Sequence, residues 1–161
     1  MQKKAIVIGC DNAAVDLKKI VIKILEEKGF AYEDIGVAGA DDNTAYPLIA
    51  QKVCDKIIQS GYQKEGVLLC GTGIGMCMCA NKFPGIFAAV CHDNFSAERS
   101  RLSNNGNLIC MGSRVIGPEL AKKIMAEWLS TSYLPGGNSQ SKVDAMRSID
   151  ADTRRAQISS S

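Results

Sequence analysis

The chain has 161 residues, enough for one domain with a substantial core, and its 46% apolar and 22% charged residues are typical of globular proteins. A net charge of +2 does not indicate binding to nucleic acid or to an anionic membrane, so any phosphate site must be local. No apolar run approaches the roughly 18 residues of a membrane span. The start of the chain lacks the apolar region of a signal peptide, which predicts a cytoplasmic protein.

Apolar patterns predict an alternation of strands and helices along the chain. Residues 3–9 form a nearly continuous apolar run, as expected of a strand buried on both faces. A helical pattern begins at Leu17 and continues until Gly29 ends it. The further pairs, in chain order, are strand 31–36 and helix 46–60, strand 66–70 and helix 74–83, strand 85–91 and helix 95–103, and strand 107–112 and helix 118–128.

This alternation predicts one α/β domain, a doubly wound, Rossmann-like, five-stranded parallel sheet with helices on both faces. We place the domain in residues 1–150, with a glycine-containing loop at 135–141 and a polar tail at 151–161. Ligands of such sheets bind beyond the carboxyl ends of the strands. The polar groups at those ends are Cys10–Asn12, Cys70–Gly73, His92–Asp93 and Gly112–Arg114. Asp11 has a second reading, since an aspartate at this position can simply cap the following helix.

The most informative stretch is LLCGTGIG at residues 68–75, where a buried strand ends on a thiol and a glycine-spaced loop opens a helix. Gly71, Gly73 and Gly75 allow positive φ angles and can turn successive N–H groups toward an anion. Beside them the thiolate form of Cys70 would be stabilised, and Thr72 adds a hydroxyl. Together these groups can move a proton between the carbons of an α-hydroxy carbonyl through an enediolate. The residues alone equally allow a buried cysteine before a tight turn.

Other chemistries find less support in the sequence. The glycine loop does not fit the GxGxxG dinucleotide pattern, which would need a glycine at Met76, and no Walker A lysine follows it. The seven cysteines lack CxxC spacing and the chain has a single histidine, His92, so we expect no metal and no cofactor. A redox protein is a further reading of the cysteine count, but Cys77 and Cys79 fall inside the helix after Cys70 and not beside it.

Several longer motifs resemble the type B ribose-5-phosphate isomerases and the related galactose-6-phosphate isomerase subunits. They are IGCDNAA near the start, YPLIAQKV at 46–53, LLCGTGIGMCMCANKFPGI at 68–86, SAERSRLSNNGNLICMGSRVIGPELAKKI at 96–124 and PGGNSQSKV at 135–143. The resemblance covers nearly the whole chain. It implies a flavodoxin-like sheet, isomerisation of a phosphorylated sugar without a cofactor, and a homodimer (or a tetramer) with active sites at the subunit interface.

The resemblance assigns roles to residues of the loop and of the strand ends. Cys70 matches the catalytic base that moves a proton between C1 and C2, and Thr72 matches the residue that assists transfer between the oxygens. The amides of Gly71, Gly73, Ile74 and Gly75 match the hole that holds the enediolate. Asp11 and Tyr46 match substrate contacts, Arg114 matches a phosphate-binding arginine, and Asn104 matches an asparagine that reaches in from the partner subunit.

Four positions depart from the pattern of the ribose-5-phosphate isomerases. Asn12 stands where these proteins have a histidine after GCD, and Ser103 stands where they have the histidine that opens the furanose ring. Asn138 and Lys142 replace two arginines after the glycine pair, and lysine keeps the charge of arginine but not its bidentate geometry. We include all four among the expected substrate-binding residues.

These departures favour a substrate that needs no ring opening. A tetrose 4-phosphate cannot close a furanose ring because its O4 carries the phosphate. The sequence therefore predicts an isomerase of a tetrulose 4-phosphate, with ribose 5-phosphate as the competing substrate. The alternative from another class is a sugar-phosphate-binding subunit that is non-catalytic or depends on a partner chain. The intact Cys70, Thr72 and loop glycines favour the enzyme.

Overall fold

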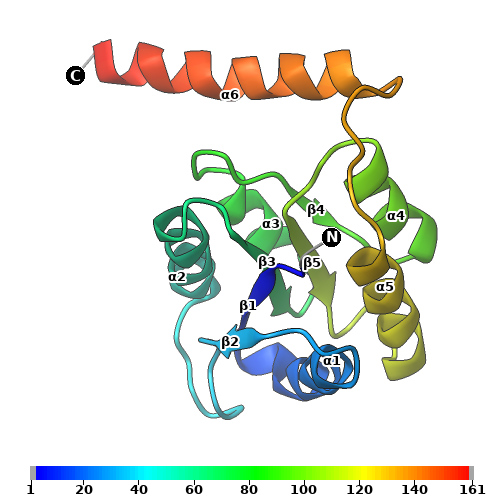
Figure 1. The fold of residues 1–161 in the computed structure, drawn as a ribbon. Helices are drawn as coiled ribbons and strands as arrows, with labels where there is room; N and C mark the ends of the chain where they lie inside the picture. Colours follow the sequence, from blue (N-terminus) through cyan, green and yellow to red (C-terminus); the bar gives the residue numbers. More distant parts are fainter. Residues whose placement is uncertain (1–2, 160–161) are drawn as a thin grey trace.

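Five parallel strands form the centre of the protein in the computed structural model, which describes residues 3–159 (Figure 1). They are β1 (Ala5–Cys10), β2 (Tyr32–Asp34), β3 (Lys64–Cys70), β4 (Ala88–Val90) and β5 (Leu108–Gly112), in the order β2-β1-β3-β5-β4. The apolar runs of β1, β3 and β5 are buried because helices cover both faces of these central strands. The predicted doubly wound parallel sheet is confirmed.

The strand order differs from that of flavodoxin in its last two strands. Flavodoxin-like sheets follow the order 2-1-3-4-5, whereas here β5 lies between β3 and β4. Cys70 at the end of β3 is therefore the register partner of Gly112 at the end of β5. β4 is shorter than the predicted strand 85–91, since the N–H of Phe87 donates to the side chain of Asn107 and not to a neighbouring strand.

Helices cover both faces of the sheet in two layers. One layer holds α2 (Tyr46–Gln59) and α3 (Ile74–Ala80), and the other holds α1 (Val15–Glu27), α4 (Asn94–Leu102) and α5 (Pro118–Ser130), with the short 3-10 helix η1 (Asn12–Ala14) leading into α1. Each long helix turns an apolar stripe toward the sheet, such as Val21, Ile24 and Leu25 in α1. None of the helices in the described part of the chain is long and apolar enough to cross a membrane.

The last helix, α6 (Gln140–Ser159), crosses the amino-terminal edge of the sheet, at the top of Figure 1. Val143 is buried, and the N–H of Gly85 donates to the Asp150 carboxylate at 3.0 Å, which holds α6 against the loop before β4. The helix continues past residue 151, where the sequence predicts the start of a polar tail, and residues 160 and 161 of that tail lie outside the described residues. A domain boundary at residue 150 stays a prediction.

Candidate active site

Cys70 ends β3 at the carboxyl edge of the sheet, and the chain turns at once into α3. The Cys70 side chain is 5% exposed, and its Sγ accepts a hydrogen bond from the N–H of Gly73 at 3.0 Å. Thr72 is exposed, and its hydroxyl accepts a hydrogen bond from the N–H of Ile74 at 3.3 Å. Both readings of the stretch therefore apply, since the cysteine is buried before a tight turn and its sulfur also faces an amide donor.

Backbone segments pack so closely around this thiol that only glycine fits at two positions. A Cβ on Gly73, whose φ is +77°, would lie 2.9 Å from the carbonyl carbon of Met111 in β5. A Cβ on Gly112 would lie 2.5 Å from the carbonyl carbon of Thr72. The loop after β3 is therefore seated directly on the end of β5, which sets the position of the amide that faces Cys70.

Two expected substrate contacts, Tyr46 and Arg114, lie against the same loop. The ring of Tyr46, the first residue of α2, occupies the space that a Cβ on Gly75 would need, with the Tyr46 Cζ only 2.6 Å away. The Arg114 guanidinium lies 3.4 Å from the position of a Cβ on Gly71, and the backbone N–H of Arg114 donates to the Gly71 carbonyl at 3.0 Å. The structure thus places a cation at the start of the loop and an aromatic ring at its end.

Asp11 and Asn12 complete this edge at the end of β1. The Asp11 carboxylate accepts a hydrogen bond from the N–H of Ala13 at 3.0 Å and so caps η1. Burial raises the pKa of Asp11, against the opposing effects of that hydrogen bond and of Arg114. Asn12 Nδ2 donates to Asn43 Oδ1 at 3.2 Å. A hollow of about 490 Å³ lined by Asn12 and Arg114 lies here, within the size range of small-molecule sites.

His92, to which the motifs assign no role, lies on the same edge just after β4. Its Nε2 accepts a hydrogen bond from the N–H of Gly112 at 2.9 Å, which requires a neutral imidazole with its proton on Nδ1. Burial lowers the pKa of His92, although the charge of Asp93 opposes the shift. His92 therefore supports the end of β5 on which the Cys70 loop is seated. Its position directly after a predicted strand is the one signal in the sequence that places it at this edge.

Four of the expected substrate residues lie at the opposite edge of the sheet. Ser103 and Asn104 follow α4, Asn138 lies in the loop before α6, and Lys142 lies in the first turn of α6. The paired stretch of β3 that ends at Cys70 is about 13 Å long, and it separates these four residues from the thiol. A single chain therefore does not bring all the expected residues together.

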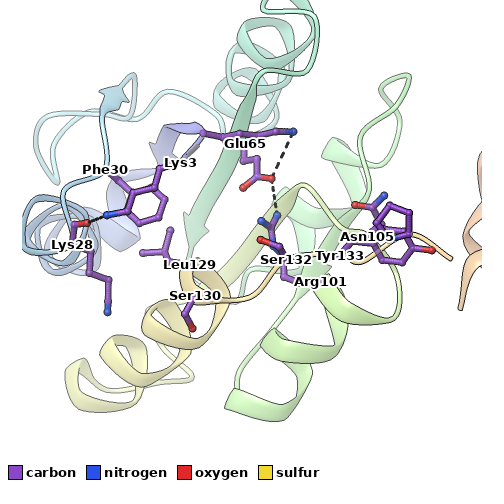
Figure 2. A pocket seen from close by; sticks show the side chains of 12 residues that line it. Lys3, Lys28, Phe30, Glu65, Arg101, Asn105, Leu129, Ser130, Ser132 and Tyr133 are labelled. Carbon is purple, nitrogen blue, oxygen red and sulfur yellow. Dashed lines mark hydrogen bonds and ion pairs between the residues drawn. The ribbon is translucent and has the colours of Figure 1, made fainter. Parts of the chain in front are cut away.

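A second hollow, of about 730 Å³, opens at this opposite edge, as Figure 2 shows. Its described lining includes Lys3, Arg101 and Tyr133 but none of the expected substrate residues. Three of the charges in its wall are paired, since Glu65 Oε1 lies 2.8 Å from Arg101 Nη1 and 3.9 Å from Lys4 Nζ. Neither hollow has a cysteine in its lining, but Asn12 and Arg114 of the smaller one are expected substrate residues, and Arg114 contacts the Cys70 loop, so we place the active site at that edge.

The seven cysteines are all free thiols in the structure. A hydrogen bond with Cys110 lowers the pKa of Cys77 in α3 to about 7, although burial opposes this shift. Burial raises the pKa of Cys91 to about 11. In the part of the chain that the structure describes, no group of three or more His, Cys, Asp or Glu side chains is placed to hold a metal ion.

Comparison with known proteins gives the family of the chain. The family model described as Ribose/Galactose Isomerase matches residues 6–146. D-erythrulose-4-phosphate isomerase of Pectobacterium atrosepticum is 47% identical over 140 residues, which is 87% of this chain and 91% of that protein. Ribose-5-P isomerase B of Listeria innocua is 44% identical over 149 residues, which is 92% of this chain and 99% of that protein.

Solved structures agree with these sequence matches. The type B ribose 5-phosphate isomerase of Leishmania infantum superposes with a TM-score of 0.87 at 34% sequence identity, covering 94% of this chain and 99% of that chain. The type B enzyme of Clostridium thermocellum superposes with a TM-score of 0.85 at 33% identity, covering 92% and 99%. The chain therefore belongs to the ribose/galactose isomerase family and is an aldose–ketose isomerase.

Proposed function

We propose that the protein interconverts the aldose and ketose forms of a phosphorylated sugar in the cytoplasm, with Cys70 as the base that moves a proton between C1 and C2. The observation that carries this proposal is the Sγ of Cys70, held 3.0 Å from the N–H of Gly73 at the carboxyl edge of the sheet. The thiolate takes a proton from the carbon next to the carbonyl and returns it to the neighbouring carbon. The electron pair stays within the enediolate, so the reaction needs no external oxidant.

The oxygens of the enediolate need donors and a proton carrier. Backbone amides of the loop from Gly71 to Gly75 supply donors at the point where negative charge develops, and the N–H groups of Gly73 and Ile74 would exchange Cys70 and Thr72 for the substrate oxygens to do so. The hydroxyl of Thr72, exposed beside the loop, is suited to carry a proton between O1 and O2. Arg114 lies next to Gly71 and supplies a positive charge on this edge for the phosphate.

The substrate we propose is a tetrulose 4-phosphate. Ser103 replaces the ring-opening histidine, and a serine hydroxyl does not titrate near neutral pH, so it is a poor general acid for opening a furanose. A tetrose 4-phosphate has no furanose to open. The similarity to the D-erythrulose-4-phosphate isomerase of Pectobacterium atrosepticum supports this choice. Ribose 5-phosphate stays the competing substrate, since the similarity to the Listeria innocua protein is nearly as high.

We further propose a homodimer in which each active site takes residues from both chains. The support is the division of the expected residues between two edges of the sheet, which one chain cannot bring together. The Cys70 edge also exposes apolar side chains on α2 and α3 that a second chain would cover, namely Tyr46, Leu48, Ile74 and Met78. Asn104 of one chain would then reach the Cys70 loop of its partner.

An isomerisation assay with ribose 5-phosphate and with both enantiomers of erythrulose 4-phosphate tests the reaction and the substrate. We expect turnover of one tetrulose, a loss of roughly a hundredfold or more in Cys70→Ala, and little change in the matched variant Cys79→Ala. Efficient turnover of ribose 5-phosphate would contradict the ring-opening argument. Wild-type turnover in Cys70→Ala would contradict the assignment of the base.

A mixture of two inactive variants tests whether the site needs two chains. Refolding Cys70→Ala together with Asn104→Ala produces mixed dimers, each with one site that has both residues intact. We expect about a quarter of the wild-type activity from random mixing, with neither variant active alone. Failure to recover activity would contradict a shared site. Recovery of activity would show that the chain depends on a partner and that this partner is a second copy of the same chain.

A further inference from the structure

Ser103 is held by an arginine of its own helix. Arg99 in the last turn of α4 donates from Nε to the Ser103 Oγ at 2.9 Å, and its Nη2 donates to the same oxygen. Its Nη1 donates to Glu98 Oε1 at 3.0 Å. The side chain of Arg99 is 41% exposed. Two of the five N–H donors of the guanidinium thus have no acceptor among residues 3–159, and they are open to a ligand.

The other two arginines near this edge, Arg101 and Arg147, each lie over an aromatic ring. Arg101 is 11% exposed, pairs with Glu65 at 2.8 Å, and lies over the ring of Trp128 at 4.5 Å, so it belongs to the core. Arg147 lies over the ring of Phe87 at 5.8 Å. Arg99 is therefore the arginine whose remaining donors lie beside Ser103.

The chemistry of the substrate decides what these donors would meet. A group that opens a furanose must contact the ring oxygen, which is O4 in a pentose 5-phosphate. In a tetrose 4-phosphate the same O4 is esterified with phosphate. A residue at the position of Ser103 would therefore face a phosphate group and not a ring oxygen, and phosphate is best bound by the planar fork of a guanidinium.

We propose that Arg99, positioned by Ser103, binds the phosphate of a four-carbon sugar phosphate in the active site of the partner chain and so selects a substrate whose phosphate is on O4. The inference rests on the proposed function, because it needs the segment Ser103–Asn104 to reach the partner's Cys70 loop. It accounts for two departures together: the ring-opening histidine is absent, and a guanidinium beside Ser103 replaces the positive charge lost at Asn138. Glu98 orients the fork from the other side.

Binding of inorganic phosphate tests the site without any turnover. Isothermal titration should show that Arg99→Gln weakens phosphate binding about tenfold or more, as expected for the loss of charge-assisted hydrogen bonds. The phosphate affinity of Arg99→Lys should lie between those of the wild type and Arg99→Gln, because lysine keeps the positive charge but not the planar fork of the guanidinium. The control is Arg155→Gln, an equal change of charge at an exposed position of α6, which should bind phosphate like the wild type. Equal phosphate affinity in wild type and Arg99→Gln, or no phosphate binding by the wild type, would overturn the proposal.

Kinetics separate a binding role from a structural one. With a tetrulose 4-phosphate as substrate, Arg99→Gln should raise KM about tenfold or more with kcat changed only a few-fold. In an equal mixture with Cys70→Ala, a low-KM component from about half of the active sites should appear beside the high-KM sites of the Arg99→Gln homodimers, because each mixed dimer has one site with Cys70 from one chain and Arg99 from the other. A mixture that shows only the high KM would overturn the placement of Arg99 in the partner's site.

The two proposals fail in different ways. If the wild type turns over neither sugar yet binds phosphate through Arg99, the proposed reaction is wrong and the phosphate site stands. If the wild type isomerises a tetrulose 4-phosphate and Arg99→Gln leaves both KM and phosphate affinity unchanged, the reaction stands and the role of Arg99 is wrong.

Discussion

Gly73 is the residue whose replacement most directly tests the geometry of the thiol. Its φ of +77° lies in the left-handed region, where an alanine costs about 1–2 kcal/mol. A Cβ there would also lie 2.9 Å from the carbonyl carbon and 3.2 Å from the Cα of Met111, which are backbone atoms of a central strand and cannot rotate away. Such overpacking costs about 1–3 kcal/mol more. We therefore expect Gly73→Ala to lower the free energy of unfolding by about 2–5 kcal/mol.

Gly61 offers a matched control for the backbone contribution. Its φ is +62°, and no described atom lies within 4 Å of the position of its Cβ, so Gly61→Ala carries the conformational cost without the collision. Urea unfolding of both variants should show a clearly larger loss for Gly73→Ala. The same change displaces the N–H that faces Cys70 Sγ, so kcat should fall at least about tenfold in Gly73→Ala and stay at the wild-type value in Gly61→Ala. Equal losses of stability, or wild-type kcat in Gly73→Ala, would refute the proposed packing of the loop on β5.

Three further predictions concern titrating groups. Burial raises the pKa of Asp11 in the folded state, so its negative charge lowers the free energy of unfolding once the pH rises above about 4. In urea unfolding, Asp11→Asn should therefore be more stable than wild type at pH 7, with the difference gone at pH 3. The same variant should be less active. Burial lowers the pKa of His92, so the stability from its hydrogen bond with Gly112 is present near pH 7 and is lost as pH falls through the folded pKa. The imidazole of His92, the single histidine, should titrate below pH 6.5 when followed by NMR. On acidification to pH 5, His92→Gln should lose less stability than the wild type does. Iodoacetamide should label Cys77, whose pKa is about 7, well before it labels Cys54, because burial raises the pKa of Cys54 to about 12. Equal labelling of the two cysteines in a mass-spectrometric time course would contradict the hydrogen bond between Cys77 and Cys110.

Much of the fold follows from local patterns. The apolar runs before Cys10, Cys70 and Gly112 predict buried parallel strands, and all three are found. The loop from Gly71 to Gly75 is predicted at the carboxyl edge of the sheet for the same reason. Period and turn residues are properties of neighbours in the chain, so a sequence contains them directly. The membership in an isomerase family could also be inferred, because its motifs span nearly the whole chain.

Other features depend on contacts between distant segments, and only the tertiary structure decided them. The exchange of β4 and β5 in the strand order sets Gly112 beside Cys70 and within hydrogen-bond reach of His92, which no local pattern encodes. The polar composition after residue 140 did not predict a helix, because α6 is held along the sheet edge by contacts with distant segments, namely the buried side chain of Val143 and the hydrogen bond from Gly85 to Asp150. The hydrogen bonds from Arg99 to Ser103 likewise come from side-chain packing at the end of α4.

The sequence by itself thus determined the fold class, the reactive loop and the family, since each is written in short segments whose residues are neighbours along the chain. The sequence also assigned Asp11, Cys70 and Arg114 to the carboxyl ends of the strands, and the tertiary structure decided which strands are neighbours and that the remaining expected residues lie at the opposite edge. Cys70, Asp11 and Arg114 lie at one edge, while Ser103 and Asn104 lie at the other, with the paired stretch of β3, about 13 Å long, between the two edges. The reason is physical: parallel strands all end at the same edge, and a helix that follows one strand must return its chain to the opposite edge before the next strand begins.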